Sequence, residues 1–110
     1  MVNYEPAALD AVFGALADTT RRAIVARLAA GGELSVSALA EPFSVSMPAI
    51  LKHLGVLDRV GLVHREKRGR TVYCRLEPHT LEDASRWLDE TSRFWEASLD
   101  RLEDFLEGPP

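Results

Sequence analysis

The sequence predicts an α+β fold that is mainly helical and contains one small β-hairpin. Two observations predict it. Between residues 44 and 76 a capped helix, a glycine stop, a short strand, a basic turn and a second strand follow one another in that order. From residue 78 to 107 apolar side chains recur every seven positions, which is typical of one long helix with an apolar seam.

Length and composition favour one domain over residues 1–110. The chain has 110 residues, of which 46% are hydrophobic, enough for one core and few for two. No apolar run is long enough to span a bilayer, and the first ten residues lack the basic and apolar regions of a signal peptide. The single cysteine, Cys74, excludes an internal disulfide. We therefore expect a cytoplasmic protein without a membrane partner.

Two helices are predicted at the start of the chain. Residues 6–17 place Leu9, Val12, Phe13 and Leu16 on one stripe. Asp18 has the character of an N-cap for a second helix over residues 19–30, which ends at a pair of glycines. Arg21 and Arg22 would lie in the first turn of that helix, where the helix dipole disfavours cations. We expect them to have acidic or phosphate partners, with an ion pair inside the protein favoured over a DNA contact.

Residues 37–60 have the pattern of two helices joined by a tight turn. Ser37 is the expected cap of a short helix from residue 38 to about 42 or 43, preceded by a minor strand over residues 34–36. Ser46 is the expected cap of the next helix, which has Pro48 in its first turn and ends before Gly61. This spacing is that of a helix-turn-helix, whose second helix reads DNA.

The faces of the second helix separate at 100° per residue. Ile50, Leu54 and Leu57 fall on the side that would be buried, whereas Leu51 and Lys52 fall on the opposite side. Leu51 is a large apolar residue in an outward position. In a major groove it would meet a thymine methyl group, and the alternative is that it packs on a neighbouring helix.

Residues 62–76 are predicted to form the wing, a hairpin whose strands cover residues 62–66 and 71–76. Alternation places Cys74 on the apolar face, as a buried small hydrophobe and not a redox sensor. The tip between Arg65 and Arg70 is strongly basic and would follow the DNA backbone or enter the minor groove.

Charge is distributed unevenly along the chain. The net charge is -4, yet residues 52–75 carry seven basic and two acidic residues, whereas residues 77–110 carry ten acidic and three basic ones. A concentrated positive strip is what binding to phosphates requires. The overall negative charge therefore does not exclude a nucleic-acid partner.

The predicted helix over residues 78–107 would be about 40 Å long, more than a core of short elements can cover. Its apolar seam indicates a symmetric homodimer, with a buried helix in a monomer as the alternative. The expected interface consists of Leu9, Phe13, Leu81, Leu88, Phe94, Trp95, Leu99, Leu102 and Leu106.

These elements together resemble the ArsR/SmtB family of winged helix-turn-helix repressors. The resemblance is carried by ALADTTRRAIVARLA as the second helix, ELSVSALAEPFSVSMPAILKHLGVLDRVGLV as the helix-turn-helix and REKRGRTVYCRL as the wing. It implies a homodimer that binds a pseudo-twofold operator and represses transcription.

Departures from the family pattern indicate a metal-independent member. Ser35-Val36-Ser37 stands where arsenic and cadmium sensors carry two cysteines around a valine, and hydroxyls do not replace thiolates for soft metals. The last helix has only His79 near its start, unlike zinc sensors. Met47 and Leu51 stand where relatives place small polar residues, so the resemblance does not carry hydrogen-bond readout to these two positions. We expect no metal and no cofactor.

The sequence thus predicts a DNA-binding transcriptional regulator that is not an enzyme, because no nucleophile and base, phosphate loop or metal cluster is present. A winged-helix module that binds proteins is the alternative. The inducer stays open: a small ligand between the long helices, a redox change at Cys74, a partner protein, or none. The predicted partner is double-stranded operator DNA, bound by Ser44, Ser46, Met47, Pro48, Leu51, Lys52, Arg59, Arg65, Lys67, Arg68 and Arg70.

Overall fold

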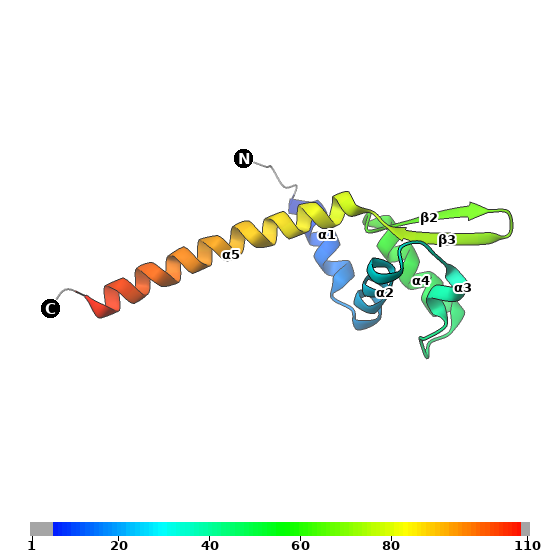
Figure 1. The fold of residues 1–110 in the computed structure, drawn as a ribbon, viewed down its shortest axis with the longest axis horizontal. Coiled ribbons are helices and arrows are strands. Elements are labelled where there is room, and N and C mark those ends of the chain that lie inside the picture. Colours follow the sequence, from blue (N-terminus) through cyan, green and yellow to red (C-terminus); the bar gives the residue numbers. More distant parts are fainter. Residues whose placement is uncertain (1–5, 109–110) are drawn as a thin grey trace.

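The computed structural model describes residues 6–108, and the first five residues, part of the segment considered above for a signal peptide, lie outside them. Its elements are α1 (Pro6–Leu16), α2 (Thr19–Gly31), β1 (Leu34–Ser35), α3 (Val36–Ala40), α4 (Met47–Arg59), β2 (Val63–Arg68), β3 (Thr71–Leu76) and α5 (Pro78–Glu107). A body of helices and a small sheet lies at one end, and α5 projects from it (Figure 1). The predicted mainly helical α+β class is confirmed.

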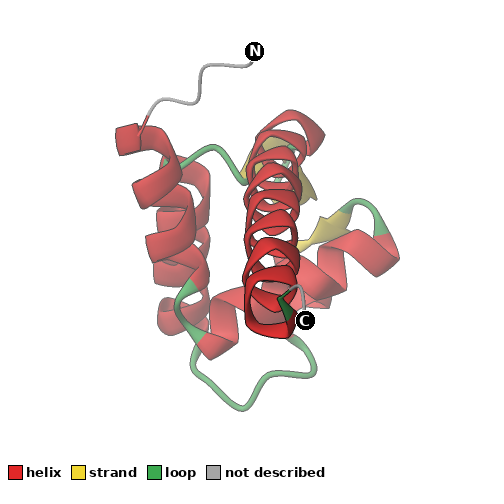
Figure 2. Ribbon diagram, turned by 90° about the vertical axis from the view of Figure 1, so that its left-hand side faces the viewer, coloured by secondary structure: helices red, strands yellow, loops and turns green. Residues whose placement is uncertain are grey.

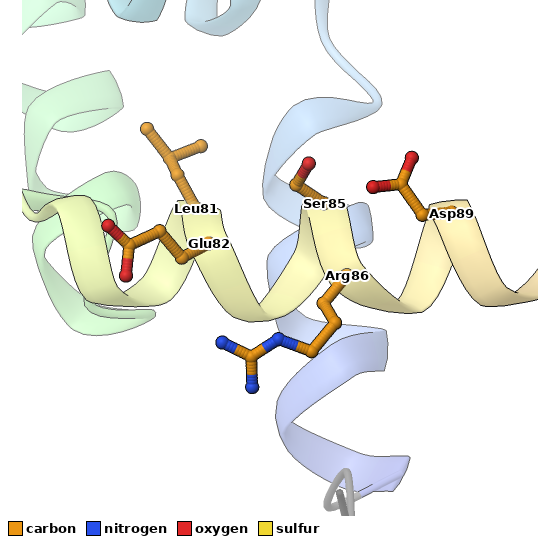
Figure 3. Close-up of a pocket in the computed structure, with 5 residues that line it drawn as sticks. All are labelled: Leu81, Glu82, Ser85, Arg86 and Asp89. Atoms are coloured by element: carbon orange, nitrogen blue, oxygen red, sulfur yellow. The ribbon is translucent and has the colours of Figure 1, made fainter.

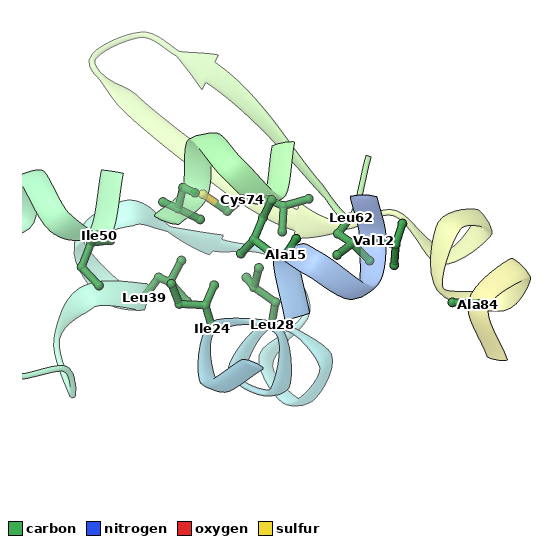
Figure 4. Close-up of a cluster of buried hydrophobic side chains, with 12 residues drawn as sticks. Val12, Ala15, Ile24, Leu28, Leu39, Ile50, Leu62, Cys74 and Ala84 are labelled. Atoms are coloured by element: carbon green, nitrogen blue, oxygen red, sulfur yellow. The ribbon is translucent and has the colours of Figure 1, made fainter. Parts of the chain in front are cut away.

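The core joins every helix to the sheet. Figure 4 shows its side chains converging from α1, α2, α3, α4 and β3, with Ala84 of α5 at the edge. The residues predicted to face inward from α4, Ile50, Leu54 and Leu57, are all 0% exposed. Cys74 is also 0% exposed, so its predicted place on the apolar face of the wing is confirmed.

The sheet is antiparallel with the order β1-β3-β2. The predicted minor strand is present as β1, whose Leu34 pairs with Cys74. The hairpin differs from the prediction, because β2 continues to Arg68, which pairs with Thr71 and leaves a two-residue turn. Gly69 begins that turn with a φ of 63°, a conformation that glycine adopts without strain.

Side-chain caps fix where the short helices begin. Asp18 accepts a hydrogen bond from the backbone N–H of Arg21 at 3.0 Å, which confirms it as the N-cap of α2. The prediction that Ser37 caps the next helix is wrong. Ser35 is the cap, and its Oγ accepts from the N–H of Ala38 at 3.1 Å, so α3 starts earlier, at Val36. The β-pairing of Ser35 with Tyr73 places Ser35 directly at the start of the helix.

Arg21 and Arg22 bind mainly to the end of α1. Arg21 Nε donates to the carbonyl of Ala15, and Arg22 Nη1 donates to that of Leu16 at 2.7 Å. The carbonyls at a helix end have no partner within the helix, so guanidinium groups complete their hydrogen bonding. The expectation of acidic or phosphate partners missed these backbone acceptors.

The wing and α5 are joined by one residue, Glu77. Its N–H donates to the carbonyl of Leu62 at 2.9 Å, which ties the junction to the base of the hairpin. The first turns of α5 lie against the body, where the rings of Phe13 and Trp87 are 5.5 Å apart. Figure 2 looks nearly along α5 from its C-terminal end and shows it beside the body helices. Beyond these turns α5 extends alone, and the molecule measures 72 × 31 × 22 Å.

Candidate nucleic-acid interface

The N-terminal half of α4 is a largely exposed helix held by a buried face. Ser46 caps it, with its Oγ accepting from the N–H of Ala49 at 3.3 Å, and Pro48 occupies the first turn. Since Ile50 and Leu54 are fully buried, the helix cannot rotate to hide Leu51, which is 44% exposed. The predicted outward position of Leu51 is therefore confirmed. The exposed residues of this half and the preceding turn are Ser44, Val45, Ser46, Met47, Pro48, Leu51 and Lys52.

The two faces of the wing carry different cations. Paired residues in an antiparallel ladder project to the same side. Lys67 pairs with Val72 and Arg65 with Cys74, so these cations share the face that meets the core. Arg68 pairs with Thr71 and belongs to the outer face. On the face that meets the core, Arg65 Nε donates a hydrogen bond to Asp58 Oδ2 of α4 at 2.8 Å.

Arg68 is bound by two carboxylates and one ring. Its guanidinium donates to both oxygens of Glu33 at 2.8 and 2.7 Å and to Glu66 at 2.9 Å, and it lies 4.7 Å from the centroid of Tyr73. The hydrogen bonds from Arg68 hold the pKa of Glu33 below its ordinary value. We name Glu33, Glu66, Arg68 and Tyr73 the Arg68 cluster. Glu33 was missed at the level of sequence, because no spacing rule relates it to Arg68.

Four of the predicted DNA-binding cations form no ion pair with the described residues, and three of them lie near the wing or the start of α4: Lys52, Lys67 and Arg70. All three are exposed. Arg59 is exposed too, but it lies two turns beyond Leu51, about 12 Å along the helix axis. The structure thus separates the predicted DNA-binding arginines into Arg65 and Arg68, which are bound to carboxylates, and Arg59 and Arg70, which are exposed without such bonds.

A groove of about 330 Å³ lies between α4, α3 and the wing. Met47 and Leu51 form its α4 wall, and Arg70 comes from the wing turn. None of its lining residues is acidic; they are Val36, Ser37, Met47, Leu51, Arg70, Thr71 and Val72. The groove brings the two apolar residues of the predicted reading face together with a wing cation.

The surface of α5 is the second candidate interface. Leu9, Phe13 and Leu81 are partly buried within the single chain. The other predicted interface residues are between 51% and 72% exposed: Leu88, Phe94, Trp95, Leu99, Leu102 and Leu106. Phe105, which the prediction left out, is 80% exposed. An apolar surface of this extent is typical of an interaction site.

A hollow of about 440 Å³ lies on the same helix. Figure 3 shows Leu81, Ser85 and Asp89 on one side of α5 and Arg86 on the other. All the lining residues, which also include Glu82, belong to α5, so a single chain provides no opposing wall. The hollow is therefore an open surface and not an enclosed ligand cavity.

Known proteins match both the sequence and this geometry. A family model described as a helix-turn-helix domain matches residues 16–66. The chain is 40% identical to the arsenical resistance operon repressor of Escherichia coli, over 74% of this chain and 70% of that protein. It is 43% identical to the HTH-type transcriptional regulator Rv2034 of Mycobacterium tuberculosis, over 82% of this chain and 80% of that protein.

A solved crystal structure of an ArsR family transcriptional regulator superposes with a TM-score of 0.77 at 38% identity, covering 87% of this chain and 97% of that one. The chain belongs to the ArsR family of winged helix-turn-helix transcriptional regulators. An ArsR-like transcriptional regulator from Rhodococcus sp. RHA1 is similar as well, with a TM-score of 0.74 and 36% identity over 90% of this chain and 92% of that chain. The family resemblance predicted from the sequence is confirmed.

In this ArsR-family chain Ser35 and Ser37, the serines that the sequence resemblance compares with the cysteines of metal sensors, lie in different environments. Ser35 Oγ caps α3, and Ser37 is exposed beside the groove. Among residues 6–108, no three His, Cys, Asp or Glu side chains are grouped as a metal site would require. In the same part of the chain, no helix combines the length and apolarity needed to cross a bilayer.

Proposed function

We propose that this ArsR-family regulator is a homodimeric repressor that binds operator DNA with α4 in the major groove and the wing against the adjacent backbone. One observation carries the proposal: the exposed half of α4 and the free wing cation Arg70 line the same groove. A recognition helix beside a cationic hairpin matches the docking geometry of this fold on duplex DNA. The strip of positive charge over residues 52–75 provides the attraction to phosphates.

The residues have distinct roles in this proposal. Lys52, Lys67 and Arg70 contact phosphates, because none has an ion-pair partner among the described residues. The start of α4 is positioned on the DNA backbone by the hydroxyls and main chain of the residues around it, including Ser44, Ser46 and Pro48. Arg59 reaches a more distant phosphate. Met47 and Leu51 meet base edges. Arg65 and Arg68 hold the wing in place and contact DNA only by exchanging their carboxylate partners.

The second copy would cover the apolar surface of α5. In a twofold arrangement the exposed side chains of one α5 meet those of the other, and the open hollow on α5 gains an opposing wall. The acidic character of residues 77–110 keeps this end of each chain away from DNA. The two wings then address half-sites about one helical turn apart.

We further propose that repression by this protein does not use the cysteine metal site of arsenic and cadmium sensors. Support comes from Ser35, whose hydroxyl already caps α3, and from the weak affinity of hydroxyls for soft metals. A small-molecule or protein effector would act elsewhere. The buried Cys74 is poorly placed as a redox sensor, because burial raises the pKa of its thiol and blocks access.

The decisive experiment measures binding of the full chain to the DNA upstream of its own gene and to random duplex over a range of salt. We expect tighter binding to one site in the upstream DNA. Lys67→Glu and Arg70→Glu should each reduce the slope of log affinity against log salt by about 1.8, since a dimer loses two contacts at about 0.9 each. Arg93→Glu on α5 is the matched control, because it changes the same charge far from the wing.

Equal affinity for both DNAs would exclude sequence-specific repression. The alternative, a winged-helix module that binds a protein, is favoured only by the exposed apolar residues Met47 and Leu51. Such a module should keep its partner when Lys67 and Arg70 are reversed. A repressor should instead lose its operator in these two variants and retain it in Arg93→Glu.

A further inference from the structure

We propose that α4 identifies thymine by its 5-methyl group, with Met47 and Leu51 as the reading residues. The inference rests on the proposed function, because it requires α4 to enter the major groove. It goes further by naming the chemical feature of the base that is read. Thymine is the only base in unmodified DNA that presents an apolar group in that groove.

The first support is the orientation of α4. Ile50, Leu54 and Leu57 are completely buried, so the buried face of the helix is fixed. Met47 and Leu51 are four residues apart and therefore lie one above the other on one side. They are 42% and 44% exposed, so a large apolar ridge stands on the surface where a reading helix places its contacts.

The second support is the shortage of hydrogen-bonding readers on this helix. Arginine, asparagine and glutamine make the bidentate contacts that distinguish guanine and adenine. From residue 47 to 58 α4 has none of the three, and the whole chain has no glutamine and only one asparagine, Asn3. His53 is turned inward, with its Nδ1 3.4 Å from Arg21 Nη1. Lys52 is therefore the only side-chain donor on the exposed half of α4, and the proposed function assigns it to a phosphate.

The third support is the chemistry of the groove beside the ridge. Its walls are largely apolar, none of its residues is acidic, and Arg70 lies at the wing side. A purely apolar partner would not use Arg70 or the nearby Lys52. A partner bound only through charge would not need Met47 and Leu51. The edge of a duplex fits both requirements, because phosphates flank the bases and the methyl groups project between them.

The geometry also limits the spacing of the bases that are read. Met47 and Leu51 are separated by about 6 Å along the helix axis, close to two base-pair steps of about 3.4 Å each. Each half-site should therefore contain two thymines within two or three base pairs, on either strand. Burying one methyl group contributes about fourfold to affinity.

The test replaces thymine by deoxyuridine at single positions of the operator. Deoxyuridine keeps the base pairing and the groove hydrogen bonds and lacks only the methyl group. Binding of the full-length protein is measured by fluorescence anisotropy on matched duplexes at several salt concentrations. We expect about fourfold weaker binding for each critical methyl removed, with an unchanged salt slope, because no phosphate contact is lost.

Variants assign the effect to the residues. Leu51→Ala should bind the thymine operator more weakly and lose its sensitivity to deoxyuridine at one position, and Met47→Ala should do so at another. Lys67→Ala is the control: it should bind more weakly with a smaller salt slope and keep the full sensitivity to deoxyuridine at both positions. Circular dichroism verifies that each variant is folded. If Leu51→Ala does not fold, the deoxyuridine series with the wild-type protein and with Met47→Ala still tests methyl readout.

The outcomes separate the inference from the function beneath it. Specific binding that tolerates deoxyuridine at every position overturns methyl readout and leaves the repressor intact. Loss of sensitivity in Lys67→Ala, or its retention in both apolar variants, overturns the assignment to Met47 and Leu51. Binding without preference for any operator overturns the proposed function, and methyl readout with it.

Discussion

Arg68 and Glu33 form a two-pronged ion pair between residues that are 35 positions apart, with distances of 2.8 and 2.7 Å. Glu66 adds a third hydrogen bond at 2.9 Å, and Tyr73 lies under the guanidinium. The pair fastens the end of the wing to the loop that follows α2. The same contacts engage the guanidinium of Arg68, which would otherwise be available to DNA phosphates.

We predict that Glu33→Gln binds operator DNA more tightly than the wild type. The substitution removes the charge that competes with phosphate for Arg68, so the salt slope should grow by as much as about 0.9 per subunit. Titrations at three or more salt concentrations check this. Glu103→Gln on α5 removes the same charge away from the wing. A slope that increases equally in both variants would point to net charge alone.

The ion pair should also respond to acid. Because the folded pKa of Glu33 is lowered by Arg68, the stabilisation is fully present above the ordinary pKa of 4.5 and is lost as the pH falls through the folded value. Thermal unfolding of the wild type and Glu33→Gln should therefore differ at pH 7 and converge at lower pH. A difference that does not narrow as the pH is lowered below 4.5 would show that the charge of Glu33 is not its source.

Ser35→Ala should destabilise the protein, and Ser37→Ala should not. Ser35 Oγ satisfies the N–H of Ala38, and loss of such a cap costs about 1 kcal/mol in the free energy of unfolding. Ser37 lies within α3, where alanine is a good helix former. Urea unfolding of both variants provides the comparison. The reverse order would mean that Ser37 is the cap, as the sequence spacing first indicated.

The thiol of Cys74 should react slowly in the folded protein. It is completely buried, and burial raises its pKa, so both access and the thiolate fraction are reduced. A chromogenic disulfide reagent at pH 8 should modify it at the rate of unfolding and at once in denaturant. Rapid reaction of the native protein would return Cys74 to the set of candidate redox sensors.

Trp95 should report dimer formation. It is 59% exposed in the single chain, whereas Trp87 is partly covered by Phe13. In Trp87→Phe, which leaves Trp95 as the only tryptophan, emission should shift to longer wavelength on dilution as the interface opens. Leu99→Glu should give the diluted spectrum at every concentration. Emission independent of concentration in both proteins, with a monomer mass by sedimentation, would contradict pairing through this part of α5.

Local patterns were sufficient for the helices and for the reading face of α4. The helical period of the apolar residues placed Ile50, Leu54 and Leu57 inside and Leu51 outside. This succeeds because the buried face of a helix is set by residues three and four positions apart in the sequence. The helix predicted over residues 78–107 has the same bounds as α5, Pro78–Glu107. These features follow from the spacing of side chains along one element.

Contacts between distant segments could not be predicted in the same way. The partner of Arg68 depends on the loop before β1 lying beside the wing, and the partner of Arg65 depends on how α4 meets β2. Charge counting therefore treated the four wing cations alike. The register of the hairpin instead puts Arg65 and Lys67 on one face and Arg68 on the other, and Arg70 lies in the turn. The acceptors of Arg21 and Arg22 were missed because every residue has a backbone carbonyl, so residue type does not show which carbonyl accepts.

The single-residue junction at Glu77 has a geometric consequence for the proposed dimer. The N–H of Glu77 is hydrogen-bonded to the carbonyl of Leu62, and its Oε1 lies 3.2 Å from Arg75 Nη1. These contacts fix the orientation of α5 relative to the hairpin. The crossing angle of two α5 helices then sets the distance between the two wings. A substitution in the α5 surface that keeps the dimer but alters this angle would change the operator spacing that is preferred, without touching any residue near DNA.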